Sequence, residues 1–135
     1  MSIESLYDEQ SRAYDKKDGY EDKRSDVKAK ISRLKSALSK VSSIKHQVSK
    51  KRSEASRLAH VDKWKGNKFN EYQEEINDSL MNGFNIYYDK TDDISDKIRS
   101  KITRLENESS ELKGLIGEAW NLINDIATAI INFID

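Results

Sequence analysis

The chain has 135 residues, with 24 basic and 24 acidic side chains and a formal net charge of zero. It contains no proline and no cysteine, which excludes a disulfide scaffold and a thiolate zinc site. Because proline ends helices most reliably and turn residues are scarce, this composition favours a single domain of long helices over an all-β fold.

The first residues, MSIESLYDEQ, lack the basic and apolar regions of a secretory signal peptide, so we expect the protein to be made and folded in the cytoplasm. Near the other end, residues 114–135 are strongly apolar. Polar side chains such as Glu118 and Asp125 interrupt that stretch too often for it to span a bilayer. We therefore expect no membrane insertion.

The segment 27–63 has the pattern of a basic coiled-coil helix. Its apolar residues recur at alternating steps of four and three, with Lys45 in place of one of them. They are Val27, Ile31, Leu34, Leu38, Val41 and Val48. The segment carries a net charge of +9, but no aromatic residue is interleaved to stack on bases. We expect it to face an acidic part of its own chain and not nucleic acid.

Gly66 marks the predicted turn, because glycine adopts the left-handed conformation that ends helices and the neighbouring Asn67 suits a turn. We predict helices over 3–63 and 68–134 with a turn at 64–67. The result is one all-α domain, an elongated antiparallel helical hairpin in which residue i faces roughly residue 131 minus i.

The second helix is predicted from two apolar stripes. One contains Phe69, Tyr72, Ile76 and Leu80. The other contains Ile98, Ile102, Leu105, Leu112, Ile116, Ala119, Ile123, Ile126, Ile130 and Phe133 and is interrupted at Ser109. Asn82-Gly83 or Thr91-Asp92-Asp93 could divide this helix in two, but the aromatic residues between them favour one helix with a kink within 82–91.

The C-terminal stretch 114–135 has more apolar side chains than one neighbouring helix can cover, and its predicted neighbour, residues 1–18, is acidic. We expect the excess to bind a helix of another chain. The candidate partner-binding residues are Leu115, Trp120, Ile123, Ile126, Ile130, Ile131, Phe133 and Ile134. A membrane-surface helix usually carries lysine or arginine, and this stretch has neither.

No residue pattern supports catalysis, a cofactor or a metal site. His46 and His60 are too far apart to share a helical metal site. The acidic run from Asp89 has the first spacings of a calcium loop, but Ile94 and Ser100 occupy the positions that require glycine and glutamate. We therefore predict that the protein is not an enzyme and binds no cofactor.

The tripeptide Trp64-Lys65-Gly66, at the predicted turn of a helical hairpin, resembles the W-x-G signature of small substrates of Gram-positive type VII (ESX-like) secretion. The order of ISRLKSALSKV, WKGNKFNEYQEEI and a long second helix is similar to that of helical proteins encoded beside LXG-domain toxins. The resemblance implies a non-enzymatic adaptor, with Trp64 and Gly66 as its turn motif, that binds the helical LXG region of a toxin and promotes its export.

The resemblance also implies partners and an export signal. The partners are the LXG toxin, a second small helical protein and, as a further candidate, the type VII secretion ATPase. The signal is an aromatic residue followed four positions later by an acid. Tyr88 and Asp92 have this spacing but lie within the second helix, whereas Phe133 and Asp135 are only two residues apart.

Two alternatives remain open. The chain could be a WXG-type substrate that is secreted in its own right as a dimer, leaving the cytoplasm by a type VII route without a signal peptide. It could also be a coiled-coil structural or phage-assembly protein in which W-x-G is incidental.

Overall fold

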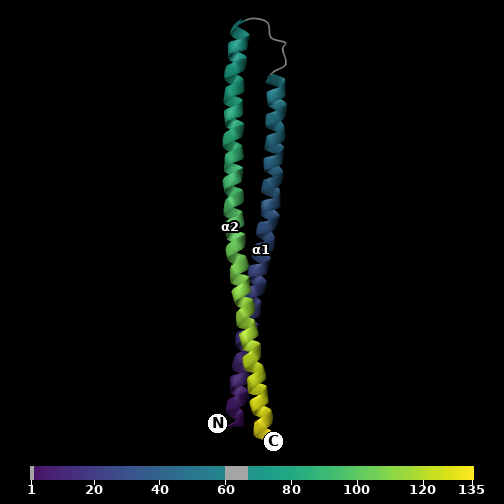
Figure 1. The fold of residues 1–135 in the computed structure, drawn as a ribbon, viewed down its shortest axis with the longest axis vertical. Helices are drawn as coiled ribbons and strands as arrows, with labels where there is room; N and C mark the ends of the chain where they lie inside the picture. The colour runs from purple at the N-terminus through teal and green to yellow at the C-terminus, as the bar shows by residue number, and fades with distance from the viewer. Residues whose placement is uncertain (1, 60–66) are drawn as a thin grey trace. The chain divides into compact units, whose positions relative to one another are not determined.

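The computed structural model describes the backbone of residues 2–59 and 67–135 and the side chains of residues 2–57 and 74–135. Helix α1 spans Ile3–Ala59 and helix α2 spans Asn67–Ile134. The two helices run antiparallel, and the start of α1 lies beside the end of α2 (Figure 1). No strand occurs in the described ranges. The prediction of an all-α helical hairpin is confirmed.

The predicted turn at 64–67 lies almost entirely outside the described residues. Trp64 and Gly66 belong to this undescribed segment, so their placement stays a prediction. At its edges, α1 is described as far as Ala59, and α2 already begins at Asn67.

Two heptad columns of α1 face α2, and every member of each is buried or half-buried. The d column is apolar throughout and contains Leu6, Ala13, Tyr20, Val27, Leu34, Val41, Val48 and Ala55. The a column contains Ile3, Gln10, Lys17, Arg24, Ile31, Leu38, Lys45 and Arg52. The predicted seam of residues 27–48 is therefore part of a repeat that runs the length of α1. Four of the eight residues in the a column of α1 are basic: Lys17, Arg24, Lys45 and Arg52.

Helix α2 has the same two columns, again buried or half-buried throughout. Its a column contains Met81, Tyr88, Ser95, Ile102, Ser109, Ile116, Ile123 and Ile130, and its d column contains Asn77, Phe84, Thr91, Ile98, Leu105, Leu112, Ala119 and Ile126. The predicted stripe through Ile76 and Leu80 is wrong, because Ile76 is 64% exposed and Leu80 is exposed as well. The repeat instead continues through Asn77 and Met81, each of which follows one of these two residues in the sequence.

Helix α2 is continuous through residues 82–91, so the alternative of two separate helices is wrong. Thr91 does not cap a new helix start. Its hydroxyl donates to the carbonyl oxygen of Tyr88 over 2.7 Å, within the helix, and its side chain is buried in the seam.

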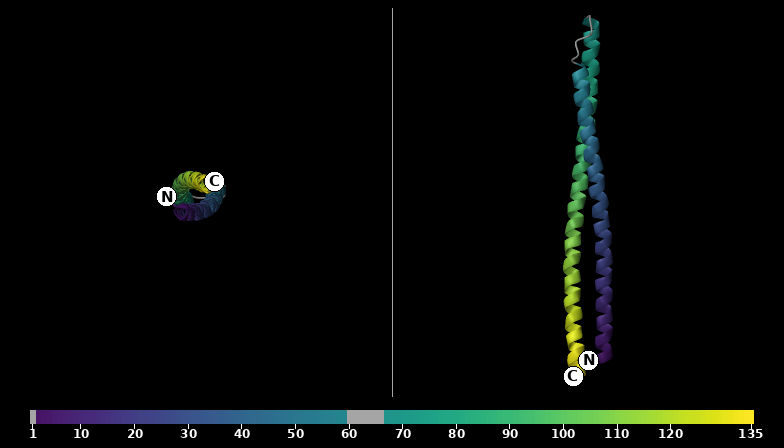
Figure 2. Two further views of the ribbon diagram at one scale, coloured as in Figure 1. Left: turned by 90° about the horizontal axis from the view of Figure 1, so that it is seen from below. Right: turned by 90° about the vertical axis from the view of Figure 1, so that its right-hand side faces the viewer.

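The chain divides into two compact units. The terminal unit contains residues 1–33 and 101–135, and the central unit contains residues 34–100. Within each unit the two helical segments lie side by side (Figure 1 and the right-hand view of Figure 2). The core of the terminal unit is formed by Leu6, Ala13, Ile123, Ile126 and Ile130.

Polar contacts between α1 and α2 define the register. In the terminal unit the Nε–H of Arg24 donates to Oγ of Ser109 over 3.3 Å, and in the central unit Lys45 pairs with Asp92. The residue numbers of these pairs add up to 133 and 137, a few residues above the predicted 131. The interlocking heptad columns determine this alignment, and the position of Gly66 predicts it only approximately.

Candidate interaction surfaces

The residues beside the a and d columns form the outer sides of each unit. In an antiparallel pair of helices, the e position of one helix lies beside the e position of the other, and the g positions meet on the opposite side. The b positions continue the e side and the c positions continue the g side. Each unit therefore has an e/b side and a g/c side, and these sides carry different side chains.

An aromatic cluster joins the helices on the e/b side of the terminal unit. The rings of Tyr14 and Trp120 meet edge to face, with centroids 6.0 Å apart and an angle of 83° between their planes. Lys17 Nζ lies 4.8 Å from the centroid of a Trp120 ring and 5.6 Å from that of Tyr14. Both distances are typical of cation–π contacts.

Lys17 occupies an a position and remains charged there. Its side chain is only 13% exposed, and its ammonium donates to Asp18 Oδ1 over 2.8 Å. This hydrogen bond is the main cause that raises the pKa of Lys17 above its ordinary value; desolvation acts in the opposite direction, and the charges of Asp18 and Glu21 add to the increase. The aliphatic part of the Lys17 side chain can therefore pack between the helices, while Asp18 and Glu21 compensate the charge of its ammonium group.

The predicted partner-binding residues fall into two groups. Ile123, Ile126 and Ile130 lie in the a and d columns and pack in the core with Leu6 and Ala13; Ile123 is only 2% exposed. The acidic N-terminal segment thus supplies more apolar cover than its composition indicates, because its few apolar residues lie in the facing columns. These three isoleucines are not available on the folded hairpin.

The remaining predicted residues are exposed: Leu115, Trp120, Ile131, Phe133 and Ile134. Ile134 is 63% exposed. Leu122, which also lies outside the predicted seam, is exposed on the same unit. Tyr7 is a further exposed apolar side chain there that is not among the candidates, and heptad phase could have identified it, since Tyr7 is an e residue beside the a column of α1.

The residues with export-signal spacing take part in contacts within the hairpin. Asp92 pairs with Lys45, whose Nζ also lies 4.7 Å from the ring centroid of Tyr88. Arg52 Cζ lies 5.4 Å from the same centroid. Tyr88 and Asp92 thus connect α2 to two basic residues of the α1 a column.

The C-terminal candidates for the signal, Phe133 and Asp135, have a different environment. Phe133 is exposed, and the backbone N–H of Asp135 donates to the carbonyl oxygen of Ile131 over 3.1 Å.

The described residues contain no group of three or more histidine, cysteine or acidic side chains that could hold a metal ion. Within the same ranges, neither helix has a stretch that is apolar enough over sufficient length to cross a membrane. The surfaces described above carry apolar side chains, aromatic rings and paired charges.

A comparison with protein-family models matches residues 5–128 to a family described as YwqH-like. Comparison with curated proteins finds no match, and comparison with solved structures finds none either. The matched residues include nearly all of both helices and both heptad repeats. The chain belongs to the YwqH-like family.

Proposed function

We propose that this protein is a non-enzymatic adaptor that binds the helical LXG region of a type VII secretion toxin and promotes its export. Membership of the YwqH-like family supports this proposal, because YwqH-like proteins are associated with LXG and WXG-type systems. The W-x-G tripeptide and the helical hairpin are consistent with the same context.

The observation that carries the proposal is the exposed apolar surface of the terminal unit. Trp120, Ile131 and Ile134 lie on its e/b side together with Tyr7, and most of this area would remain in contact with water on an isolated hairpin. Two packed helices enclose little interior, and a further helix laid against this side would cover these side chains. We name these four residues the terminal apolar face.

The partner is a helix of the toxin. A second small helical protein would complete the bundle, and the secretion ATPase would act on the assembled complex. In this proposal the protein itself performs no chemistry, so its contribution to export is to cover the apolar side of the toxin helix and to present the toxin to the machinery.

Co-expression with the product of a neighbouring LXG gene tests the proposal. We expect a stable complex and toxin export that depends on this protein. The double variant Ile131→Asp/Ile134→Asp should weaken the complex, because both side chains are exposed and the change places charge in the contact. Asn121→Asp, an exposed polar position in the same unit, is the control and should leave the complex intact.

The alternatives give different results in this experiment. A homodimer that is indifferent to the LXG product and is exported by itself would identify a WXG-type substrate. A homodimer that is neither exported nor bound to the toxin would identify a structural coiled-coil protein.

A further inference from the structure

The central unit has an apolar groove on its g/c side. The groove has a volume of about 750 Å³. Its walls include Ile44 and Val48 from α1 and Leu80, Phe84 and Tyr87 from α2. Val48 and Phe84 belong to the d columns, whereas Ile44, Leu80 and Tyr87 are g residues that the hairpin leaves exposed. The groove thus follows the line where the two helices meet.

The apolar g residues of α2 recur at the spacing that a third helix requires. Leu80, Tyr87 and Ile94 are each seven residues apart, and all three are exposed. At 1.5 Å per residue they cover about 21 Å of helix, which corresponds to two heptads of an occupant. When apolar residues extend from a and d into g, the packing face becomes broad enough to contact two helices instead of one.

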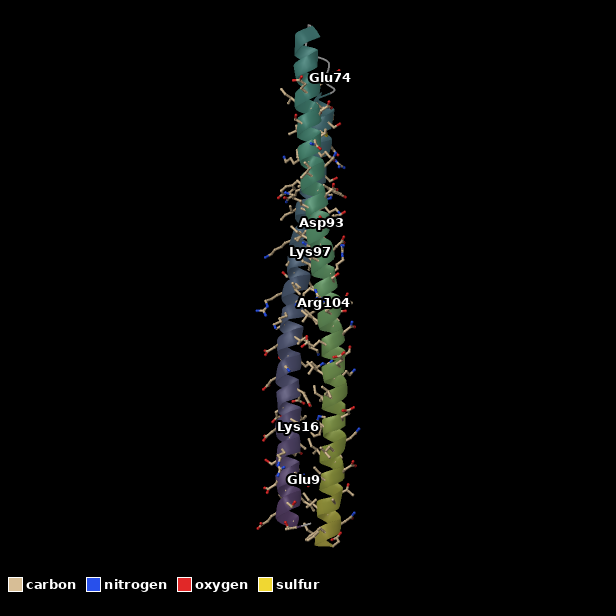
Figure 3. The ribbon with its side chains drawn as sticks, turned by 90° about the vertical axis from the view of Figure 1, so that its left-hand side faces the viewer. Glu9, Lys16, Glu74, Asp93, Lys97 and Arg104 are labelled. Carbon is tan, nitrogen blue, oxygen red and sulfur yellow. The ribbon has the colours of Figure 1, made fainter. Side chains whose placement is uncertain are left out.

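Basic side chains are frequent on this side of the central unit. Lys51 of α1 belongs to the groove lining, whereas Lys40 of α1 and Lys90 and Lys97 of α2 occupy c positions further along the same side; all four are exposed. Lys97 is labelled on α2 in Figure 3. The acidic side chain on this side, Glu54, lies 3.6 Å from Lys51 Nζ and offsets part of one charge. The g/c side of the central unit, on which the groove lies, is therefore positive.

The opposite side of the central unit has a different character. Its e and b positions on α1 are mostly serine, and on α2 they are rich in acids. The acidic residues are Glu75, Asp78, Asp89, Asp92 and Asp96. No apolar residue occupies the e or b positions of the central unit within the described side chains. A third helix that buries apolar area can therefore pack only on the g/c side.

We propose that this groove binds an amphipathic helix of another protein, whose apolar stripe is bordered by aspartate and glutamate. The concave shape fits a helix, whereas a flat membrane surface would leave the groove floor uncovered. Charge disfavours a second copy seated through the same groove, since a symmetric pair would bring the lysines of the two g/c sides together. The surface shares no residue with the terminal apolar face, so this inference goes beyond the proposed adaptor function and does not depend on it.

Binding of two synthetic peptides to the full-length protein tests the inference. Each peptide has three heptads with leucine at a and d; one carries glutamate at e and g, and the other carries lysine there. Fluorescence anisotropy at low salt measures the two affinities, and we expect the acidic peptide to bind about tenfold more tightly than the basic one or better. This preference should decrease as added salt screens the charges.

Two variants locate the site. Leu80→Glu should weaken binding of the acidic peptide by about tenfold or more, because it places a like charge in the groove. Ile86→Glu is the matched control: Ile86 lies on the same helix and is 49% exposed against 45% for Leu80, but it is not part of the groove lining. It should leave the affinity unchanged. The triple variant Lys40→Glu/Lys90→Glu/Lys97→Glu should reverse the preference toward the basic peptide, and this reversal is visible only if the protein remains folded.

Three results would overturn the inference. Equal affinity for the two peptides would show an apolar surface without charge selection. A dimer in sedimentation that Leu80→Glu dissociates and Ile86→Glu does not would identify a second copy as the occupant. Flotation with anionic vesicles that Leu80→Glu abolishes would identify a lipid surface. Failure of the LXG complex together with selective binding of the acidic peptide would reject the proposed function alone.

Discussion

Tyr14 of α1 and Trp120 of α2 meet edge to face with their ring centroids 6.0 Å apart, and Lys17 Nζ lies within 6 Å of both rings. This contact joins two e positions that are far apart in the sequence. The contact connects α1 to α2 beside the core of the terminal unit. The exposed apolar side chains lie on the same side of that unit.

A double-mutant cycle measures this contact. Tyr14→Ala and Trp120→Ala should each lower the free energy of unfolding, and the double variant should lower it by less than the sum of the two. We expect a coupling energy of about 0.5–1.5 kcal/mol, the range for aromatic pairs, measured by urea unfolding. The pair Tyr7→Ala and Trp120→Ala is the control, and additive losses for Tyr14 and Trp120 would contradict the ring contact.

The two groups of C-terminal apolar residues should respond differently to truncation. Ile123→Ala removes a core side chain that is 2% exposed and should cost about 2–5 kcal/mol of unfolding free energy. Leu122→Ala, at the next residue, removes a side chain that is 48% exposed and should cost well under 1 kcal/mol. Thermal and urea unfolding give both values, and similar losses for the two variants would contradict the assignment of Ile123 to the core.

Stability should depend on pH through Lys45. The hydrogen bond to Asp92 is the main cause that raises the pKa of Lys45 above its ordinary value of 10.5; desolvation opposes the increase, and the charge of Asp92 and contact with Tyr88 add to it. A lysine with a raised pKa in the folded state contributes stability that is fully present below 10.5 and is lost as pH rises through the higher folded-state value.

The measurement compares unfolding free energies between pH 8 and pH 12. Lys45→Gln should be less stable than the natural sequence at pH 8, and the difference should shrink above pH 10.5. Lys50→Gln, at an exposed position, is the control and should show a difference near zero throughout. A Lys45 effect that is constant over this range would mean that the charge of Lys45 does not contribute.

The hairpin could be predicted from the sequence because the 3.5-residue repeat is long and no proline interrupts it. Ser109 was the single exception predicted in the stripe from Ile98 to Ile130, and the structure places it in the seam as the acceptor of Arg24. The phase near Ile76 and Leu80 could not be predicted in the same way. There Asn77 occupies a seam position next to Met81, while Ile76 and Leu80 lie on an outer face. The apolar pattern of a single helix cannot identify which of these faces is covered.

The candidate surface was predicted less well for a related physical reason. An excess of apolar side chains in residues 114–135 is visible in the sequence, and the predicted stripe contains Ile123 but not Ile131. How much of that stripe the acidic segment 1–18 covers depends on which of its residues face α2, and Leu6 and Ala13 do so. Once their columns are aligned with α2, Ile123 is buried and Ile131 remains outside.

Trp64 remains the test of the W-x-G resemblance, because it lies outside the described residues and its role stays a prediction. If the secretion machinery recognises the tripeptide, Trp64→Ala should reduce export of the toxin by more than it reduces formation of the toxin complex. The measurement compares the fraction of toxin exported with the amount of complex recovered after co-expression. Trp120→Ala is the matched control, since it changes a tryptophan in the terminal apolar face and should reduce both quantities together. An equal loss of export and of complex for Trp64→Ala would assign that residue a purely structural role, because indole packing at a turn stabilises the hairpin on which both quantities depend.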